Sequence, residues 1–147
     1  MFKRPESVLV VVHTAGGEVL QLRRREPAGF WQSVTGSLDP GESPLAAARR
    51  ELREETGLAA DADLSDTGII NRYPIHPAWR HRYAPAVREN VEHVFTLALP
   101  ERAHIDISHR EHLEYVWLPY AEAAARAGSA TDRAAILGLF APESPQA

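Results

Sequence analysis

Three glutamates, Glu51, Glu54 and Glu55, lie within one turn of a helix predicted near the middle of this 147-residue chain. Like charges this close on a helix repel one another by a few tenths of a kcal/mol per pair, so the helix itself gives no reason for the cluster. Binding of Mg²⁺ would explain the cluster, because this ion takes oxygen ligands and prefers one or two carboxylates together with substrate phosphates. The spacing therefore predicts a metal site, although clustered glutamate is more often a solvated surface stripe.

The helix that carries these carboxylates is predicted over residues 44–56. Ser43 is a favourable N-cap, proline suits the first helical position that follows it, and Gly57 suits the position just past the end. Three apolar positions share one arc of this helix and are expected to face the core: Leu45, Ala48 and Leu52.

The segment before the helix, residues 36–42, contains the turn sequence Asp-Pro-Gly. Such a loop can fold back and place Glu42 near the helical carboxylates. Arg50 lies one turn before Glu54, and we expect it to orient a carboxylate rather than to touch substrate.

The rest of the chain supplies further predicted strands and helices. Apolar or alternating runs predict strands at residues 7–12, 18–23, 30–34, 67–73, 91–99 and 115–118. A short alanine-rich helix is expected from Pro119 to near Gly128, and a last helix, capped by Thr131 or Asp132, through Phe140. The order indicates an α/β fold with a mixed sheet covered on both faces.

Two connections and one terminus stand out between these elements. Residues 59–66 read as a polar connection, and residues 74–90 as a long loop with three prolines and a basic-aromatic stretch. A loop of this length in a compact domain is usually functional or mobile. We expect a single domain over residues 1–141 and a disordered tail over 142–147.

Composition narrows the class of protein. A net charge of −4 argues against a nucleic-acid polymer as partner. The absence of cysteine excludes disulfides, thiol catalysis and cysteine-bound zinc, and the seven histidines are scattered. No apolar run is long enough for a membrane span, and residues 1–6 lack an apolar signal core, so we expect a cytoplasmic protein without a membrane partner. A monomer or a small homo-oligomer fits these features.

Residues 36–58 also carry a specific family resemblance. Their defined positions are Gly36, Glu42, Arg50, Glu51, Leu52, Glu54, Glu55, Gly57 and Leu58. This spacing resembles the Nudix box, G-x5-E-x7-R-E-U-x-E-E-x-G-U with U apolar, at every position. A chance match at one start is on the order of 10⁻⁹. The resemblance implies an α/β/α sandwich with a mixed β-sheet, and hydrolysis of a small-molecule polyphosphate with Mg²⁺ or Mn²⁺.

Segments outside the box resemble a narrower group within this family. Residues 2–5, 30–36 and 80–85, with 111–113 and 115–118, are similar to bacterial enzymes of folate biosynthesis that cleave dihydroneopterin triphosphate. The resemblance implies Glu51, Glu55 and Glu111 as metal ligands, with Glu54 a fourth candidate. Either Glu54 or Glu111 would serve as general base, and Arg50 would complete the catalytic group.

The same resemblance implies a set of substrate contacts. They are Lys3, Arg24, Thr35, Tyr73, Pro74, Ile75, His76 and Ser129. The run from Tyr73 to His76 departs from the more aromatic and acidic run of the group. Lys3 and Arg24 could equally be ordinary surface charge. Three aromatic residues are candidates to stack on a pterin ring: Trp31, Tyr73 and Trp79.

The expected reaction is attack of an activated water at one phosphorus, which releases pyrophosphate and dihydroneopterin monophosphate. Two alternatives stay open. One is a Nudix hydrolase of nucleoside triphosphates, such as dATP or oxidised dGTP, or of dinucleoside polyphosphates. The other is a Nudix-fold binding module without turnover, a class that generally lacks box carboxylates, whereas Glu42, Glu51, Glu54 and Glu55 are all in place.

Overall fold

A computed structural model describes residues 2–59 and 63–140 of the chain. The predicted tail at 142–147 lies outside the described residues, as does the middle of the predicted connection 59–66. The elements in chain order are β1 (Glu6–Thr14), β2 (Glu18–Arg24), β3 (Trp31–Gln32), β4 (Val34–Ser37), α1 (Pro44–Thr56), β5 (Leu64–Pro74), the 3-10 helix η2 (Pro77–Arg82), β6 (Glu89–Leu99), β7 (His112–Pro119), α2 (Tyr120–Arg126) and α3 (Ala130–Leu139).

The strands form one mixed seven-stranded sheet. β1 lies near its centre and pairs in parallel with β6 along its whole length, from Glu6 opposite Val91 to Thr14 opposite Leu99. On its other side β1 pairs in antiparallel fashion with β2 and with β4. β5 pairs with β6, and β7 and β3 pair with β2, all antiparallel. The predicted mixed sheet is therefore confirmed.

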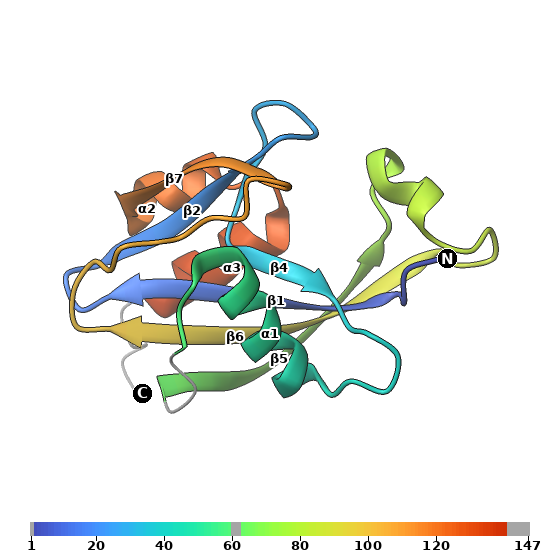
Figure 1. The fold of residues 1–147 in the computed structure, drawn as a ribbon, viewed down its shortest axis with the longest axis horizontal. Coiled ribbons are helices and arrows are strands. Elements are labelled where there is room, and N and C mark those ends of the chain that lie inside the picture. The colour runs from blue at the N-terminus through green and yellow to red at the C-terminus, as the bar shows by residue number, and fades with distance from the viewer. Residues whose placement is uncertain (1, 60–62, 141–147) are drawn as a thin grey trace, which may run out of the picture.

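The two faces of the sheet carry separate apolar clusters because successive side chains of a strand point to opposite faces. On one face Val8 and Val10 of β1 pack with Leu52 of α1. On the other face Val11 packs with Ile136 of α3 and with alanines of α2. Figure 1 shows α1 on one side of the sheet and the red helices α2 and α3 on the other. This is the α/β/α sandwich that the sequence predicts.

Helix α1 has the predicted bounds and caps. The Ser43 side chain accepts a hydrogen bond from the Ala46 amide, and Gly57 ends the helix in the left-handed region at φ 76°. The predicted core position of Leu45 is wrong, because this side chain is 39% exposed. The buried residues of this helix begin only at Ala47, so Leu45 lies in an exposed first turn.

Two other predictions need correction. The strand expected at 30–34 is two strands separated at Ser33, whose amide and hydroxyl both donate to Asp132 at 2.7 Å instead of pairing within the sheet. Helix α3 is capped by Ser129, whose hydroxyl accepts from the Asp132 amide at 3.1 Å, so neither Thr131 nor Asp132 is the cap.

The region between β5 and β6 is more ordered than predicted. It contains η2, and the strands on either side extend further than expected, from Leu64 and from Glu89. Figure 1 shows this yellow-green segment beside the N-terminal end, where the Lys3 amide donates to the Arg82 carbonyl at 2.8 Å. Within the described residues there is no helix with the length and apolar character that crossing a membrane requires.

Candidate active site

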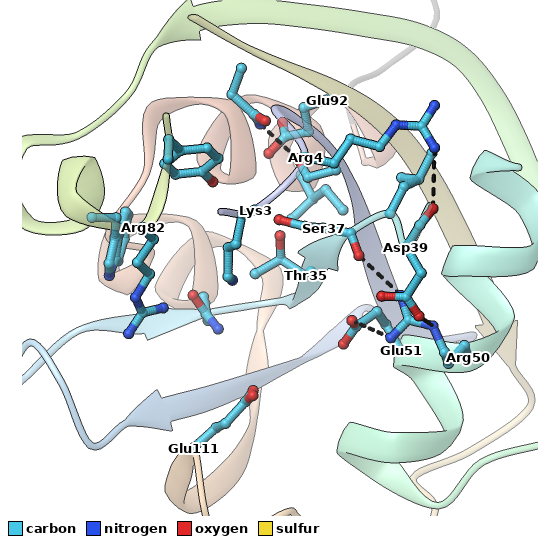
Figure 2. Close-up of a pocket in the computed structure, with 18 of the residues that line it drawn as sticks. Lys3, Arg4, Thr35, Ser37, Asp39, Arg50, Glu51, Arg82, Glu92 and Glu111 are labelled. Carbon is cyan, nitrogen blue, oxygen red and sulfur yellow. Dashed lines mark hydrogen bonds and ion pairs between the residues drawn. The ribbon is translucent and has the colours of Figure 1, made fainter. Parts of the chain in front are cut away.

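A cavity of about 1290 Å³ lies where α1, β1, β4, the segment around η2 and the start of α3 come together. Figure 2 shows Glu51 and Glu111 on one side of this cavity, Glu92 on the opposite side, and Lys3 and Thr35 between them. Glu51 and Glu111 line the first side, and the buried Glu55, which is not part of the cavity wall, lies next to Glu111. We call these three residues the carboxylate end.

Arg50 of α1 organises the carboxylate end (Figure 2). Its Nε and Nη2 donate to the two oxygens of Glu42 at 2.9 and 2.8 Å. Its Nη1 donates to Glu51 at 2.8 Å and to Glu54 at 3.3 Å, and its Nη2 also reaches the Ser37 carbonyl at 3.0 Å. The loop before α1 therefore folds back as the sequence indicates, and the guanidinium fixes three carboxylates in one network.

Glu51 and Glu55 point inward from α1 and are buried, whereas Glu54 is exposed. A side chain at Gly36 would collide with Glu51, because an added Cβ would lie 2.2 Å from its carboxyl carbon. Glu55 accepts from the Thr35 amide at 3.3 Å through Oε2, while its Oε1 is buried without a hydrogen-bond partner. The helix thus buries two carboxylates at the cost of their hydration, and of these Glu51 lines the cavity.

The electrostatics of these two groups follow from that burial. Burial raises the pKa of Glu51 to about 7, although the Arg50 charge acts against the rise. Burial also raises the pKa of Glu55 well above its usual value, and the neighbouring carboxylates of Glu51 and Glu111 add to the effect. Both groups resist ionisation unless a cation lies beside them.

Glu111 reaches the site from the segment before β7, far from α1 in the sequence. Ligand atoms of Glu55, Glu111 and His112 all lie within 4.8 Å of one another. His112 is fully buried, with its Nε2 3.2 Å from the Gln32 amide nitrogen and its Nδ1 without a partner. Burial lowers the pKa of His112 to about 4, which keeps the imidazole neutral near pH 7. The sequence prediction missed His112; its position next to Glu111 is the signal that could have identified it.

The carboxylate end fits a divalent cation. Oε1 of Glu55 has no hydrogen-bond partner, and the pKa values of Glu51 and Glu55 are both raised. Both features are expected of a site that is built to bind a positive ion. A cation would supply the partner that the protein itself does not provide.

A basic group faces the same cavity. Lys3, Arg24 and Arg82 all line it. Burial lowers the pKa of Lys3 and of Arg24, and in each case the Arg82 charge is the next largest cause. Arg24 is held by its Nε donating to the Glu26 carbonyl at 2.7 Å and by the Trp79 ring, whose centroid is 5.3 Å from the guanidinium carbon. Like charges gathered in this way favour an anionic ligand. Arg82 lay in the basic stretch noted in the sequence but was not predicted as a contact.

The other predicted contacts divide into two groups. Thr35, Tyr73 and Ser129 line the cavity. Pro74, Ile75 and His76 lie outside its wall: Ile75 is buried, and the exposed His76 accepts from the Ala78 amide at the start of η2. Of the predicted stacking residues, Tyr73 and Trp79 line the cavity. Trp31 lies outside it, under the Arg126 guanidinium at 5.0 Å.

Opposite the carboxylate end the cavity has a second polar surface, formed by Asn90, Glu92 and Asp132, which we call the inner wall. Glu92 accepts from the Tyr73 hydroxyl at 3.1 Å. Asn90 donates to Ser7 at 2.7 Å. The sequence prediction missed these three residues. The alternating pattern of β6 could have identified two of them, because the Asn90 and Glu92 side chains both point to the buried side of this strand.

Comparisons with known proteins agree on one family. The NUDIX domain family model matches residues 3–139. The chain is 43% identical over 140 residues to a protein named dihydroneopterin triphosphate diphosphatase from Escherichia coli (strain K12), with 92% of each chain covered. It is 37% identical over 123 residues to the Haemophilus influenzae protein of the same name, with 80% of this chain and 75% of the relative covered.

A solved structure gives the same picture. The E. coli dihydroneopterin triphosphate pyrophosphohydrolase superposes on the chain with a TM-score of 0.88 at 42% identity, covering 94% of this chain and 96% of that one.

Proposed function

The chain belongs to the Nudix family, and we propose that it hydrolyses dihydroneopterin triphosphate to dihydroneopterin monophosphate and pyrophosphate with Mg²⁺. One observation carries the proposal: a single cavity is lined by Glu51 and Glu111, the latter beside the buried Glu55, and by the basic side chains Lys3, Arg24 and Arg82. A metal-bound triphosphate requires both kinds of group. The pterin part of the proposal is supported by the similarity to two relatives whose names state that substrate.

We assign Glu51, Glu55 and Glu111 as the residues that would hold Mg²⁺, or Mn²⁺ in its place. Carboxylate oxygens are the ligands these hard cations prefer. When bound, the ion supplies charge neutralisation for phosphate oxygens and acidifies a coordinated water. Arg50 lines the cavity as well, but its guanidinium is engaged by the carboxylates that it binds, so it is a positioning residue in this scheme.

The remaining roles concern the substrate. Lys3, Arg24 and Arg82 would hold the triphosphate against the carboxylate end through charge-assisted hydrogen bonds. Thr35 and Ser129, which line the cavity, would contribute hydroxyl contacts. Glu54 or Glu111 would take the proton released by the attacking water; both are exposed and so can pass it on to solvent.

Pyrophosphate release from a substrate panel tests the proposal. Purified protein with Mg²⁺ is expected to turn over dihydroneopterin triphosphate faster than dATP, oxidised dGTP or a dinucleoside polyphosphate. Much slower turnover of the pterin than of dATP would make the chain a nucleotide hydrolase. No cleavage of any of these compounds with Mg²⁺ or Mn²⁺ would leave a binding module instead.

Location and assembly stay predictions. We propose a cytoplasmic location, which fits the small-molecule substrate class named for the bacterial relatives. A monomer or small homo-oligomer would suffice, because the carboxylates and basic residues of the cavity come from one chain. Size-exclusion chromatography with light scattering would measure the assembly.

A further inference from the structure

The inner wall contains two buried carboxylates, Glu92 and Asp132. Asp132 is 1% exposed and Glu92 is 3% exposed, yet both line the cavity. Among residues 2–59 and 63–140, neither carboxylate has an ion pair within 4.0 Å of a lysine, arginine or histidine. Buried charge of this kind is costly unless hydrogen-bond donors surround it.

The protein supplies only some of those donors. Asp132 accepts from the Ser33 amide and hydroxyl, one bond to each oxygen, and the Gln21 side chain is a third donor to it. Glu92 accepts from the Asn71 side chain at 3.1 Å and from the Tyr73 hydroxyl at 3.1 Å. An ionised carboxylate can accept about four hydrogen bonds, so each group keeps capacity for a donor from the cavity.

An independent observation comes from Asn90. This side chain is 4% exposed and lines the same wall. Its Nδ2 donates to Ser7 at 2.7 Å and to Tyr73 at 3.1 Å, whereas its Oδ1 is buried with no partner. Buried polar atoms in native proteins are nearly always paired, so an orphan acceptor on a cavity wall indicates a ligand donor.

The hydrogen-bonding positions that remain free on this wall are therefore all acceptors, so a ligand would have to supply the donors. We propose that the inner wall, with Asp132 as its principal group, reads the donor edge of a 2-amino-4-oxopyrimidine ring, where a ring N–H and an exocyclic amino group lie side by side. Pterins and guanine share that edge, whereas the Watson–Crick edge of adenine pairs a ring nitrogen acceptor with its amino group. This inference rests on the proposed function, because it takes the triphosphate to lie at the carboxylate end.

The arrangement of the cavity suits this assignment. Figure 2 shows Glu92 on the far side of Lys3 and Thr35 from Glu111, so a ring at the inner wall leaves its phosphate tail directed toward the carboxylates. Ser33 acts as a positioning residue, since its two bonds fix the Asp132 carboxylate and break the strand between β3 and β4.

Two pairs of nucleotides that differ only in the exocyclic amino group test the inference. Hydrolysis of dGTP is compared with that of dITP, and equilibrium binding of dGMP with that of dIMP. Wild-type protein is expected to favour the guanine compound by roughly tenfold or more in kcat/KM and in Kd, because a buried acceptor left unpaired by the analogue disfavours it. Asp132→Asn should abolish that preference, while the exposed Asp66→Asn should retain it. Each ratio compares two compounds in the same protein preparation, so it does not change if part of that preparation is unfolded.

Glu92→Gln provides a second variant in case Asp132→Asn does not fold, and it should also lower the ratio. The inference is overturned if the wild type shows no preference for the guanine compounds, or if the folded variants keep it. If no triphosphate is hydrolysed but dGMP is preferred and Asp132→Asn removes that preference, the proposed function fails and the inner-wall assignment stands.

Discussion

The carboxylate end and the inner wall of the cavity draw on different parts of the chain. Arg50 binds Ser37, Glu42, Glu51 and Glu54, all within one short loop–helix segment. On the inner wall Asp132 binds Ser33, and Asn90 binds Ser7, so each contact joins elements far apart in the chain. The groups for phosphate chemistry are thus held mainly by local contacts, and the groups for ring recognition by the tertiary fold. The two ends should respond differently to substitution.

The largest effect is expected from Glu55→Gln. Turnover should fall by more than about 100-fold, because substitutions of residues that merely orient metal ligands already cost 10–100-fold. In EDTA the variant should be more stable than wild type, because a neutral amide removes the charge that burial and Glu51 disfavour. Pyrophosphate release and thermal melting would measure both. The exposed Glu122→Gln is the control and should change neither. Near-normal turnover would remove Glu55 from the metal site.

The next effect concerns stability and pH at Glu51. Burial raises its pKa to about 7 from 4.5, so the folded state binds this proton more tightly than the unfolded chain does. Its stabilising contribution is present below the unfolded pKa and is lost as the pH rises through about 7. The stability advantage of Glu51→Gln over wild type in EDTA should therefore grow from pH 5 to pH 8, by at most on the order of 3 kcal/mol.

Denaturant unfolding of both proteins at each pH would measure that advantage. Comparing two proteins cancels the opposing titration of His112, whose pKa burial lowers. Saturating Mg²⁺ should reduce the advantage or reverse it, since the ion binds the ionised carboxylate. An advantage that is independent of pH would contradict the buried, ionisable state of Glu51.

A smaller loss is expected from Arg50→Lys. Lysine keeps the charge but cannot bind both oxygens of Glu42 while it also reaches Glu51 and Glu54. We expect the Mg²⁺ concentration for half-maximal activity to rise by roughly tenfold. Metal titrations at saturating substrate would measure it, with the exposed Arg53→Lys on the same helix as control. An unchanged metal requirement would mean that the network does not position the ligands.

The contrast between the two ends also explains what could be predicted from the sequence. The carboxylate end lies mostly within residues 36–58, where helix caps, a turn and charge spacing specify the geometry locally. Leu45 was misplaced because it lies in the first turn of α1, where burial has not yet begun, although it shares the angular arc of the buried residues. Most strands of the sheet could be predicted from runs of apolar or alternating residues. The exception is Ser33, whose amide donates to Asp132 instead of pairing with a neighbouring strand.

The inner wall depends on contacts that no local pattern specifies. Asp132 reads as a helix cap in the sequence, and only the tertiary fold brings Ser33 to it. Glu111 could be assigned only through family resemblance, since its approach to Glu55 depends on how β7 pairs with β2. Arg82 sits in a segment whose position is fixed by contact with the N-terminal residues, a pairing that spacing cannot predict.

The smallest effect is expected at the rim of the cavity, from Trp79→Ala. The ring contacts the Arg24 guanidinium at 5.3 Å and the Phe30 ring edge-on, so it holds the arginine in place without reaching the carboxylates. Loss of a half-buried cation–π contact worth about 1 kcal/mol should raise KM for the triphosphate by roughly 5-fold and leave kcat unchanged. Trp79→Phe should retain part of the contact. Trp31→Ala is the matched control, because Trp31 has a similar contact with Arg126 at 5.0 Å outside the cavity. A fall in kcat with KM unchanged would mean that Trp79 acts on the carboxylate end. The division of roles between the two ends of the cavity would then not hold.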